Sequence, residues 1–353
     1  MIGRIRRIRS RIVQLFELTN QISALQQNIA QLQEENRNLR DVLREIHAIT
    51  DHTQKIAGET LSALNEEKAF NNLRFRRLPL TDHVYQALGR IESRLSESAT
   101  EWNSLPFSVY SQFGEDGIIQ FLLRQIAVSR KEFVEIGVED YLEANTRFLL
   151  LYNRWKGVLI ECDENAVAKL VQDAPYRSRE IQVVREFVTR ENINSILCDA
   201  GVSGSVGLLS IDIDGNDYWV WEASEIVADI VIIEYNFRFG PDPAVAVPYD
   251  PDFNKNSAHP SGIYYGASLK ALTLLAEKKG YALIGCSDGG VNAFFVRRDK
   301  LGGSVRATTV HDAFVFGQHM EMRNAEGELV RASWEEQHHL LMSLPLVRFE
   351  GEA

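Results

Sequence analysis

The pattern of hydrophobic and polar positions is most regular between residues 133 and 236, where four short apolar runs carry an acidic residue at or near their ends. The runs are Phe-Val-Glu-Ile-Gly at 133–137, Val-Leu-Ile-Glu at 158–161, Leu-Leu-Ser-Ile-Asp-Ile-Asp-Gly at 208–215 and Ile-Val-Ile-Ile-Glu-Tyr-Asn at 230–236. Short aliphatic runs separated by helical spacing are typical of buried parallel strands. The sequence therefore predicts an open α/β sheet, whose strands resume at 281–285 and 293–297. Because ligands bind at the carboxyl ends of such strands, we expect the acidic residues to lie along one rim.

A different pattern, with a period of seven residues, begins near the N-terminus. Leucine, isoleucine and one asparagine fill the a and d positions of successive heptads: Leu15, Ile22, Ile29, Asn36 and Leu43 at a, and Leu18, Leu25, Leu32, Leu39 and Ile46 at d. This pattern is typical of a parallel two-stranded coiled coil, in which a single buried Asn selects register and dimer state. The sequence therefore predicts an α-helical coiled coil within residues 1–65 and a homodimer formed through it.

Residues 2–16 carry isoleucines and a phenylalanine at helical spacing between arginines. A basic amphipathic helix of this kind can lie in the interface of an anionic membrane. The alternative is a solvated extension of the coiled coil. The first interpretation places the protein peripherally at the inner face of the membrane, and the second leaves it in the cytoplasm.

Charge and composition narrow the class of protein. The chain of 353 residues has a net charge of −11, although five arginines precede its first acidic residue, Glu17. An acidic body is unsuited to phosphate contacts, so we expect no nucleic-acid partner. The three cysteines are too scattered for a disulfide framework. We expect a cytoplasmic protein with a helical connector at 66–106, a catalytic domain at 107–300 and a C-terminal extension at 301–353.

A series of short motifs follows one order between residues 108 and 300. They are Ser-Gln-Phe-Gly-Glu-Asp-Gly at 111–117, Phe-Val-Glu-Ile-Gly at 133–137, Asn-Thr-Arg at 145–147, Leu-Ile-Glu-Cys-Asp at 159–163, Ser-Ile-Asp-Ile-Asp-Gly-Asn-Asp-Tyr at 210–218, Ile-Glu-Tyr-Asn at 233–236 and Tyr-Tyr-Gly-Ala-Ser at 264–268. In this order they resemble the FkbM-type class I methyltransferases found with bacterial surface-glycan biosynthesis. The resemblance rests on the order of the motifs, since no single one of them is enough.

The resemblance implies a Rossmann-like class I methyltransferase sheet and S-adenosylmethionine as the cofactor. It implies O-methylation of a sugar in a bacterial surface glycan, or of a related saccharide or glycolipid acceptor. Cofactor contacts are implied for Gln112, Glu135, Gly137, Asn145, Thr146, Glu161, Phe187 and Asp212. The alternative is a catalytically silent scaffold that organises a glycan-assembly complex through its coiled coil. An NAD-linked oxidoreductase is disfavoured because a Gly-x-Gly-x-x-Gly loop is absent.

The residues of the predicted rim suit parts of this cofactor. Glu161 can accept hydrogen bonds from ribose hydroxyls, and Gly137 lets the backbone approach a ligand. Phe187 would flank the adenine, although a place in the core is an equal alternative. One departure concerns Glu139 and Tyr141, which stand where related first loops usually carry further glycines. Their side chains would crowd the cofactor unless the loop is rearranged.

The segment Asp-Ile-Asp-Gly-Asn-Asp at 212–217 offers several carboxylates after the third run. On a strand, Asp212 and Asp214 would point to the same side. With Glu234 and Asn236 from the neighbouring strand they form a candidate Mg²⁺ site, because this ion prefers oxygen ligands. A second alternative is metal-free catalysis, with Asp214 as the general base. A third is that one or two of these carboxylates cap the following helix.

The segment 237–266 interrupts the sheet pattern and is rich in Pro, Asn and aromatic residues. Long ordered loops of this kind tend to be functional, and aromatic faces beside Asp and Asn side chains suit a sugar. Candidate saccharide contacts are Tyr249, Asp250, Asp252, Asn254 and His259. Surface packing is the alternative for each of them. His259 is also a candidate catalytic base, since imidazole titrates near neutral pH.

Overall fold

The computed structural model describes residues 79–95, 107–172, 180–318, 320–324 and 327–350. The predicted coiled coil and amphipathic segment lie outside these residues. Helix α2 (Pro79–Leu95) falls within the predicted connector. Among the helices that the structure describes, none combines the length and the apolar character that a membrane crossing requires.

Seven strands form the central sheet in the order β3-β2-β1-β4-β5-β8-β7. They are β1 (Glu132–Ile136), β2 (Lys156–Glu161), β3 (Ile181–Arg185), β4 (Ser205–Ile211), β5 (Val227–Glu234), β7 (Tyr281–Cys286) and β8 (Asn292–Arg297). Strands β1 to β5 are parallel, whereas β8 is antiparallel to both β5 and β7. The order 3-2-1-4-5 is that of a Rossmann sheet, which binds ligands where the strand order reverses. The predicted Rossmann-like α/β fold is therefore confirmed.

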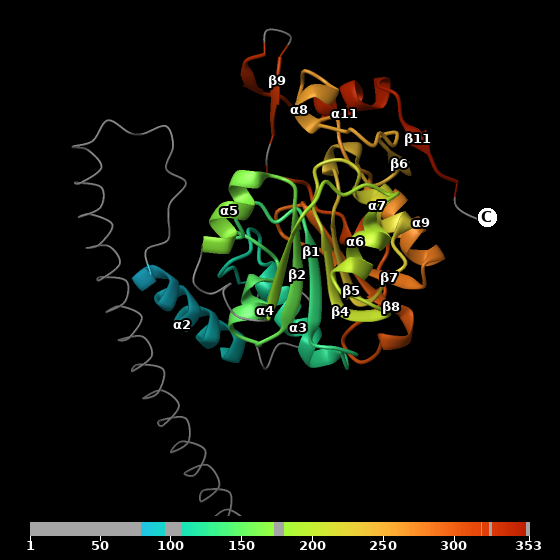
Figure 1. Ribbon diagram of the computed structural model, residues 1–353. Helices are drawn as coiled ribbons and strands as arrows, with labels where there is room; N and C mark the ends of the chain where they lie inside the picture. Colours follow the sequence, from blue (N-terminus) through green and yellow to red (C-terminus); the bar gives the residue numbers. More distant parts are fainter. Residues whose placement is uncertain (1–78, 96–106, 173–179, 319, 325–326, 351–353) are drawn as a thin grey trace, which may run out of the picture. The chain divides into compact units, whose positions relative to one another are not determined.

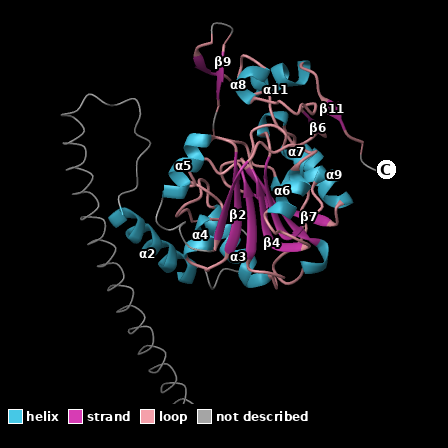
Figure 2. Cartoon of the chain, in the orientation of Figure 1, coloured by secondary structure: helices cyan, strands magenta, loops and turns pink. Residues whose placement is uncertain are grey.

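Helices cover both faces of this sheet (Figures 1 and 2). The helices on one face are α6 (Ile193–Asp199), α7 (Asp217–Ala223) and α9 (Leu269–Lys278), and those on the other are α3 (Glu115–Gln125), α4 (Arg147–Leu151) and α5 (Glu164–Gln172). Because side chains alternate between the faces of a strand, Val134 and Ile136 of β1 pack toward the first group. Phe133 packs toward the second. Glu135 shares the face of Phe133, and this position decides its partners.

Several elements after β5 lie near the carboxyl ends of the parallel strands (Figure 1). They are η3 (Phe237–Phe239), β6 (Val245–Ala246), α8 (Lys255–Ala258), β9 (Glu321–Arg323), β10 (Leu329–Arg331), α11 (Trp334–Ser343) and β11 (Val347–Arg348). By contrast, η4 (Arg298–Lys300) follows the antiparallel strand β8 and lies near the start of β5, where Lys300 faces Asp229, and α10 (Val310–Ala313) comes between η4 and β9 in the chain. Strand β11 pairs with β6, and Leu341 of α11 shares a small core with Phe239 and Val245. The C-terminal chain thus packs on the segment 237–266, in which the sequence predicted saccharide contacts.

Candidate active site

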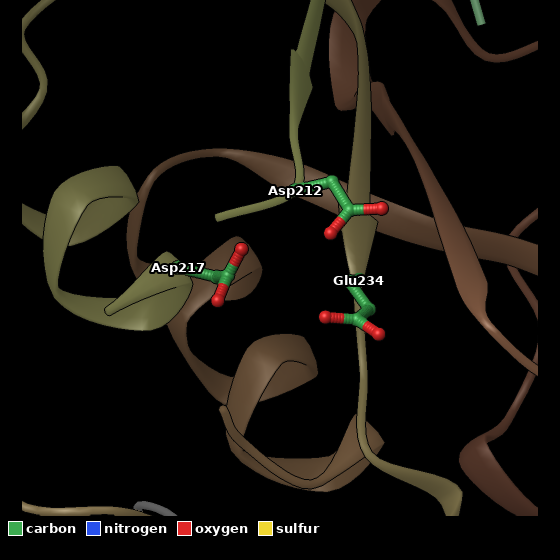
Figure 3. Close-up of side chains that lie close together, drawn as sticks. All are labelled: Asp212, Asp217 and Glu234. Atoms are coloured by element: carbon green, nitrogen blue, oxygen red, sulfur yellow. The ribbon is translucent and has the colours of Figure 1, made fainter. Parts of the chain in front are cut away.

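Three carboxylates meet at the carboxyl ends of β4 and β5, as Figure 3 shows. Asp212 directly follows β4, Glu234 is the last residue of β5, and Asp217 is the first residue of α7. One carboxylate oxygen of each lies within 4.8 Å of the others. The sheet register explains part of this meeting: Ile211 of β4 stands beside Ile233 of β5, so the residues that follow them are neighbours. We call these three residues the acidic cluster.

Burial makes the acidic cluster difficult to ionise. It raises the pKa of Asp212 and of Glu234 well above their usual values, and neighbouring carboxylates raise both further. Burial also raises the pKa of Asp217 to about 6, against the opposing effect of the Ile213 and Gly215 amides, which donate to its oxygens at 2.8 and 2.9 Å. One oxygen of Glu234, Oε2, is buried and has no hydrogen-bond partner among the residues that the structure describes. Buried groups of this kind need a proton or a cation nearby.

Asp214, a predicted metal ligand and general base, lies outside the group of three. The reason is local: β4 ends at Ile211, and Asp214 has a left-handed backbone with φ 56°. The alternation of a strand therefore does not continue to this residue. Asp214 is half exposed and pairs with Lys255 of α8. Asp217 supplies the third carboxylate of the acidic cluster in its place.

Asn236, the other predicted metal ligand, holds two parts of the chain together. Its Nδ2 donates to the carbonyl oxygens of Ile263 at 2.9 Å and Tyr265 at 3.1 Å. Its Oδ1 accepts from the amide of Arg238 at 3.2 Å. These bonds tie the end of β5 to the chain before α9, so the amide serves the scaffold around the cluster.

Glu161 stands at the end of β2, as predicted, but much of its carboxylate is engaged by the backbone. It accepts from the amides of Glu139 at 2.7 Å, Cys162 at 2.7 Å and Asp163 at 2.9 Å. A carboxylate has about four lone-pair positions. The Cys162 thiol also hydrogen-bonds to this carboxylate, so an outside donor such as a ribose hydroxyl would take the place of the thiol. Glu161 also shapes the loop that follows β1.

The loop after β1 carries Glu139 and Tyr141 where related loops usually have glycines, and its backbone adopts torsion angles that are typical of glycine. Gly137 has φ 80°, and a Cβ there would lie 1.7 Å from the carbonyl oxygen of Asp212. Glu139 and Tyr141 have φ values of 46° and 57°, in the left-handed region that glycine adopts most readily. The Tyr141 side chain is buried in the core, with its hydroxyl 2.7 Å from Oγ1 of Thr146. Tyr141 thus combines a left-handed backbone with a side chain that packs in the core.

Glu135, Asn145 and Thr146, three implied cofactor contacts, form a buried group beside α4. Glu135 accepts from the amides of Asn145 at 2.8 Å and Thr146 at 3.1 Å, and from the Thr146 hydroxyl. Asn145 donates to Oγ of Ser210 at 3.1 Å. Glu135 reaches these partners because its side chain lies on the same face of β1 as Phe133. The resulting hydrogen bonds hold the end of the loop after β1.

The remaining predicted residues occupy separate places. Gln112 is exposed. Phe187, just after β3, is 47% exposed, so the core alternative for this ring is wrong. Nδ1 of His259 lies 2.8 Å from Oγ of Ser261, and its ring contacts Tyr264. His259 therefore makes these contacts within its own loop.

The buried Glu135 predicts how stability depends on pH. Burial raises its pKa from 4.5 to about 7, more than its hydrogen bonds lower it. The folded chain then binds this proton more tightly than the unfolded chain, so stability falls as pH rises from about 4.5 to about 7. Glu135 can lower the free energy of unfolding by at most about 1.4 kcal/mol for each pH unit in this range. We expect Glu135→Gln to flatten the fall in the free energy of unfolding, measured by urea denaturation at several pH values. Glu132→Gln on the same strand is the control, and equal slopes for both variants would contradict the assignment.

Three solved structures to which this chain is similar have 12–14% sequence identity with it. No family model matches the chain, and no curated protein matches it. It is similar to a putative caffeoyl-CoA O-methyltransferase from Staphylococcus aureus, at 13% identity over 62% of this chain and 99% of that one, with a TM-score of 0.38. An O-methyltransferase family protein from Burkholderia thailandensis has 12% identity over 69% and 70%, with a TM-score of 0.34. The O-methyltransferase TomG from Streptomyces achromogenes, in complex with SAM, has 14% identity over 60% and 89%, with a TM-score of 0.33.

Proposed function

We propose that this protein is an S-adenosylmethionine-dependent O-methyltransferase that acts on a hydroxyl of a saccharide. The observation that carries the proposal is the acidic cluster, which stands at the carboxyl ends of β4 and β5 in a Rossmann-like sheet. Removal of a hydroxyl proton needs a base beside the acceptor. Buried carboxylates with a raised pKa are suited to that task. The FkbM-type resemblance of the motifs supports the same class of reaction.

The residues near the turn after β1 fit an adenosyl cofactor. Glu161 would accept from a ribose hydroxyl in place of the Cys162 thiol, and Phe187 exposes its ring for the adenine. Gly137 keeps the turn free of a side chain. When bound, the cofactor supplies an electrophilic methyl group. The chain itself holds the acceptor oxygen and removes its proton.

Asp212 is the proposed base, with Glu234 as its neighbour. As the acceptor oxygen gains the methyl group, its proton passes to the carboxylate, so the ether product leaves uncharged. A second candidate is Mg²⁺ bound by the three carboxylates that lie within 4.8 Å of one another. Such an ion would lower the pKa of the acceptor hydroxyl.

A saccharide or glycolipid acceptor is proposed from the segment 237–266. Tyr249 meets Trp219 edge to face at 6.3 Å between ring centres, and the Arg190 guanidinium lies 4.2 Å from the centre of the Tyr249 ring. Aromatic and charged groups together suit the CH face and the hydroxyls of a sugar. The proposed coiled-coil dimer, with residues 2–16 on an anionic membrane, would bring this site to a glycolipid.

Cofactor binding is the experiment that tests the proposal. We expect Glu161→Gln to weaken S-adenosylmethionine binding by about 1–3 kcal/mol, the size of hydrogen bonds lost to a charged group, as measured by calorimetry. Glutamine is chosen because it retains an oxygen for the Cys162 and Asp163 amides. Glu164→Gln, in a residue whose side chain is 82% exposed on α5, is the control. Unchanged affinity in Glu161→Gln would place the cofactor elsewhere, and no binding by the wild-type chain would favour the silent scaffold.

A further inference from the structure

Lys255 brings a positive charge to the acidic cluster. It is the first residue of α8, and its side chain is 29% exposed. Its ammonium group pairs with Oδ1 of Asp214 and lies 3.9 Å from the centre of the Tyr265 ring. Glu234 and Asp212 also act on it electrostatically. An ammonium group has three hydrogens, and Asp214 and the face of Tyr265 account for two of them.

The chain before Lys255 is held against the loop that follows β4. Nδ2 of Asn216 donates to the carbonyl oxygen of Asp250 at 2.7 Å. The ring of Phe253 packs on Gly215 so closely that a Cβ at this position would lie 2.2 Å from a ring atom. Packing therefore holds the backbone before Lys255 against this loop, and the Lys255 ammonium group pairs there with Asp214, beside the acidic cluster.

We propose that Lys255 is the resident cation of the acidic cluster and that a divalent ion can enter only by displacing its ammonium group. Two observations support competition for one place. The three carboxylates have a spacing suited to a divalent ion, and the buried Glu234 Oε2 has no hydrogen-bond partner in the described part of the chain. A tethered ammonium group and a divalent ion are attracted by the same negative charge.

Lys255 also acquires a role in methyl transfer, and this role rests on the proposed function. The acceptor oxygen would bind against the Lys255 ammonium group, whose third hydrogen is directed to it, while Asp212 takes the hydroxyl proton. The positive charge that stabilises the developing alkoxide then comes from the chain, and methyl transfer proceeds without a metal ion.

The test measures the binding of Mn²⁺ alone to the full chain, by electron paramagnetic resonance of the free ion. We expect the wild-type chain to bind Mn²⁺ weakly and Lys255→Met to bind one ion roughly tenfold more tightly or better, because the substitution removes the charge and keeps the side-chain length. Lys255→Arg retains the charge and should bind Mn²⁺ as weakly as the wild type. Lys278→Met, at an exposed position of α9, is the matched control.

Gly215→Ala tests the same inference without changing a charge. A Cβ at this position would displace Phe253 and with it the segment that holds Lys255, so the affinity for Mn²⁺ should rise. The proposal is overturned if Lys255→Met binds Mn²⁺ no more tightly than the wild type, whether or not the wild type binds the ion. If Lys255→Met does not fold, as judged by circular dichroism, Lys255→Gln and Gly215→Ala decide by the same criterion. Failure of S-adenosylmethionine to bind would reject the proposed function and leave the Mn²⁺ result standing.

Discussion

Replacing Asp212 with asparagine is expected to slow methyl transfer by a factor on the order of 10²–10⁴, which is the usual contribution of a positioned base. Burial raises the pKa of Asp212, and the nearby Asp214 and Asp217 raise it further, so this carboxylate is disposed to take up a proton. Asparagine keeps the size of the side chain and cannot accept that proton. The measurement is single-turnover transfer of labelled methyl from S-adenosylmethionine to a panel of simple glycosides, with cofactor affinity measured in parallel and expected to stay nearly unchanged.

The matched variant is Asp214→Asn, which compares the proposed base Asp212 with Asp214, the aspartate that the sequence predicted as the base. The Asp214 side chain is 55% exposed and paired with Lys255, so its loss should slow transfer by less than tenfold. A larger loss of rate in Asp214→Asn than in Asp212→Asn would make Asp214 the base. Full activity in both variants would exclude an acidic catalytic centre, and His259 would then be the next candidate.

Gly137→Ala is expected to lower the free energy of unfolding by roughly 3 kcal/mol, because strain and overpacking add at this position. The backbone has φ 80°, which disfavours any residue with a Cβ, and the new Cβ would lie 1.7 Å from the carbonyl oxygen of Asp212. Relief of this clash would move the backbone at the start of the acidic cluster. We therefore expect weaker cofactor binding as well as lower stability, measured by urea denaturation and calorimetry.

Gly201→Ala separates the cost of backbone strain from the cost of overpacking. Gly201 has a similar φ of 75°, but a Cβ there would meet nothing within 4 Å. Its substitution should therefore cost only the backbone strain, about 1 kcal/mol. Equal losses for the two variants would show that the contact with Asp212 yields without cost and that the β1 turn is not packed tightly against the end of β4.

The candidate site was predictable in part from the runs of aliphatic residues. Each run that ends in an acid became a strand, and Asp212, Glu161 and Glu234 stand at strand ends as expected. The partners of Glu135, in contrast, do not follow from its place near the end of an aliphatic run. It belongs to a predicted strand, but its place in the alternation turns it toward the amides of Asn145 and Thr146, just before α4. Applying the period of two within β1 would have indicated this orientation.

The sequence by itself determined the Rossmann-like sheet, because a run of aliphatic side chains is stable only when buried on both faces, and it placed the acids at the ends of those runs. Only the tertiary structure decided which charged groups meet. Asp217 joins Asp212 and Glu234 because the backbone turns at Asp214, and Lys255 arrives from α8 because Phe253 packs on Gly215. Such meetings depend on backbone torsions and on packing between distant segments, and neither leaves a periodic signal in the chain.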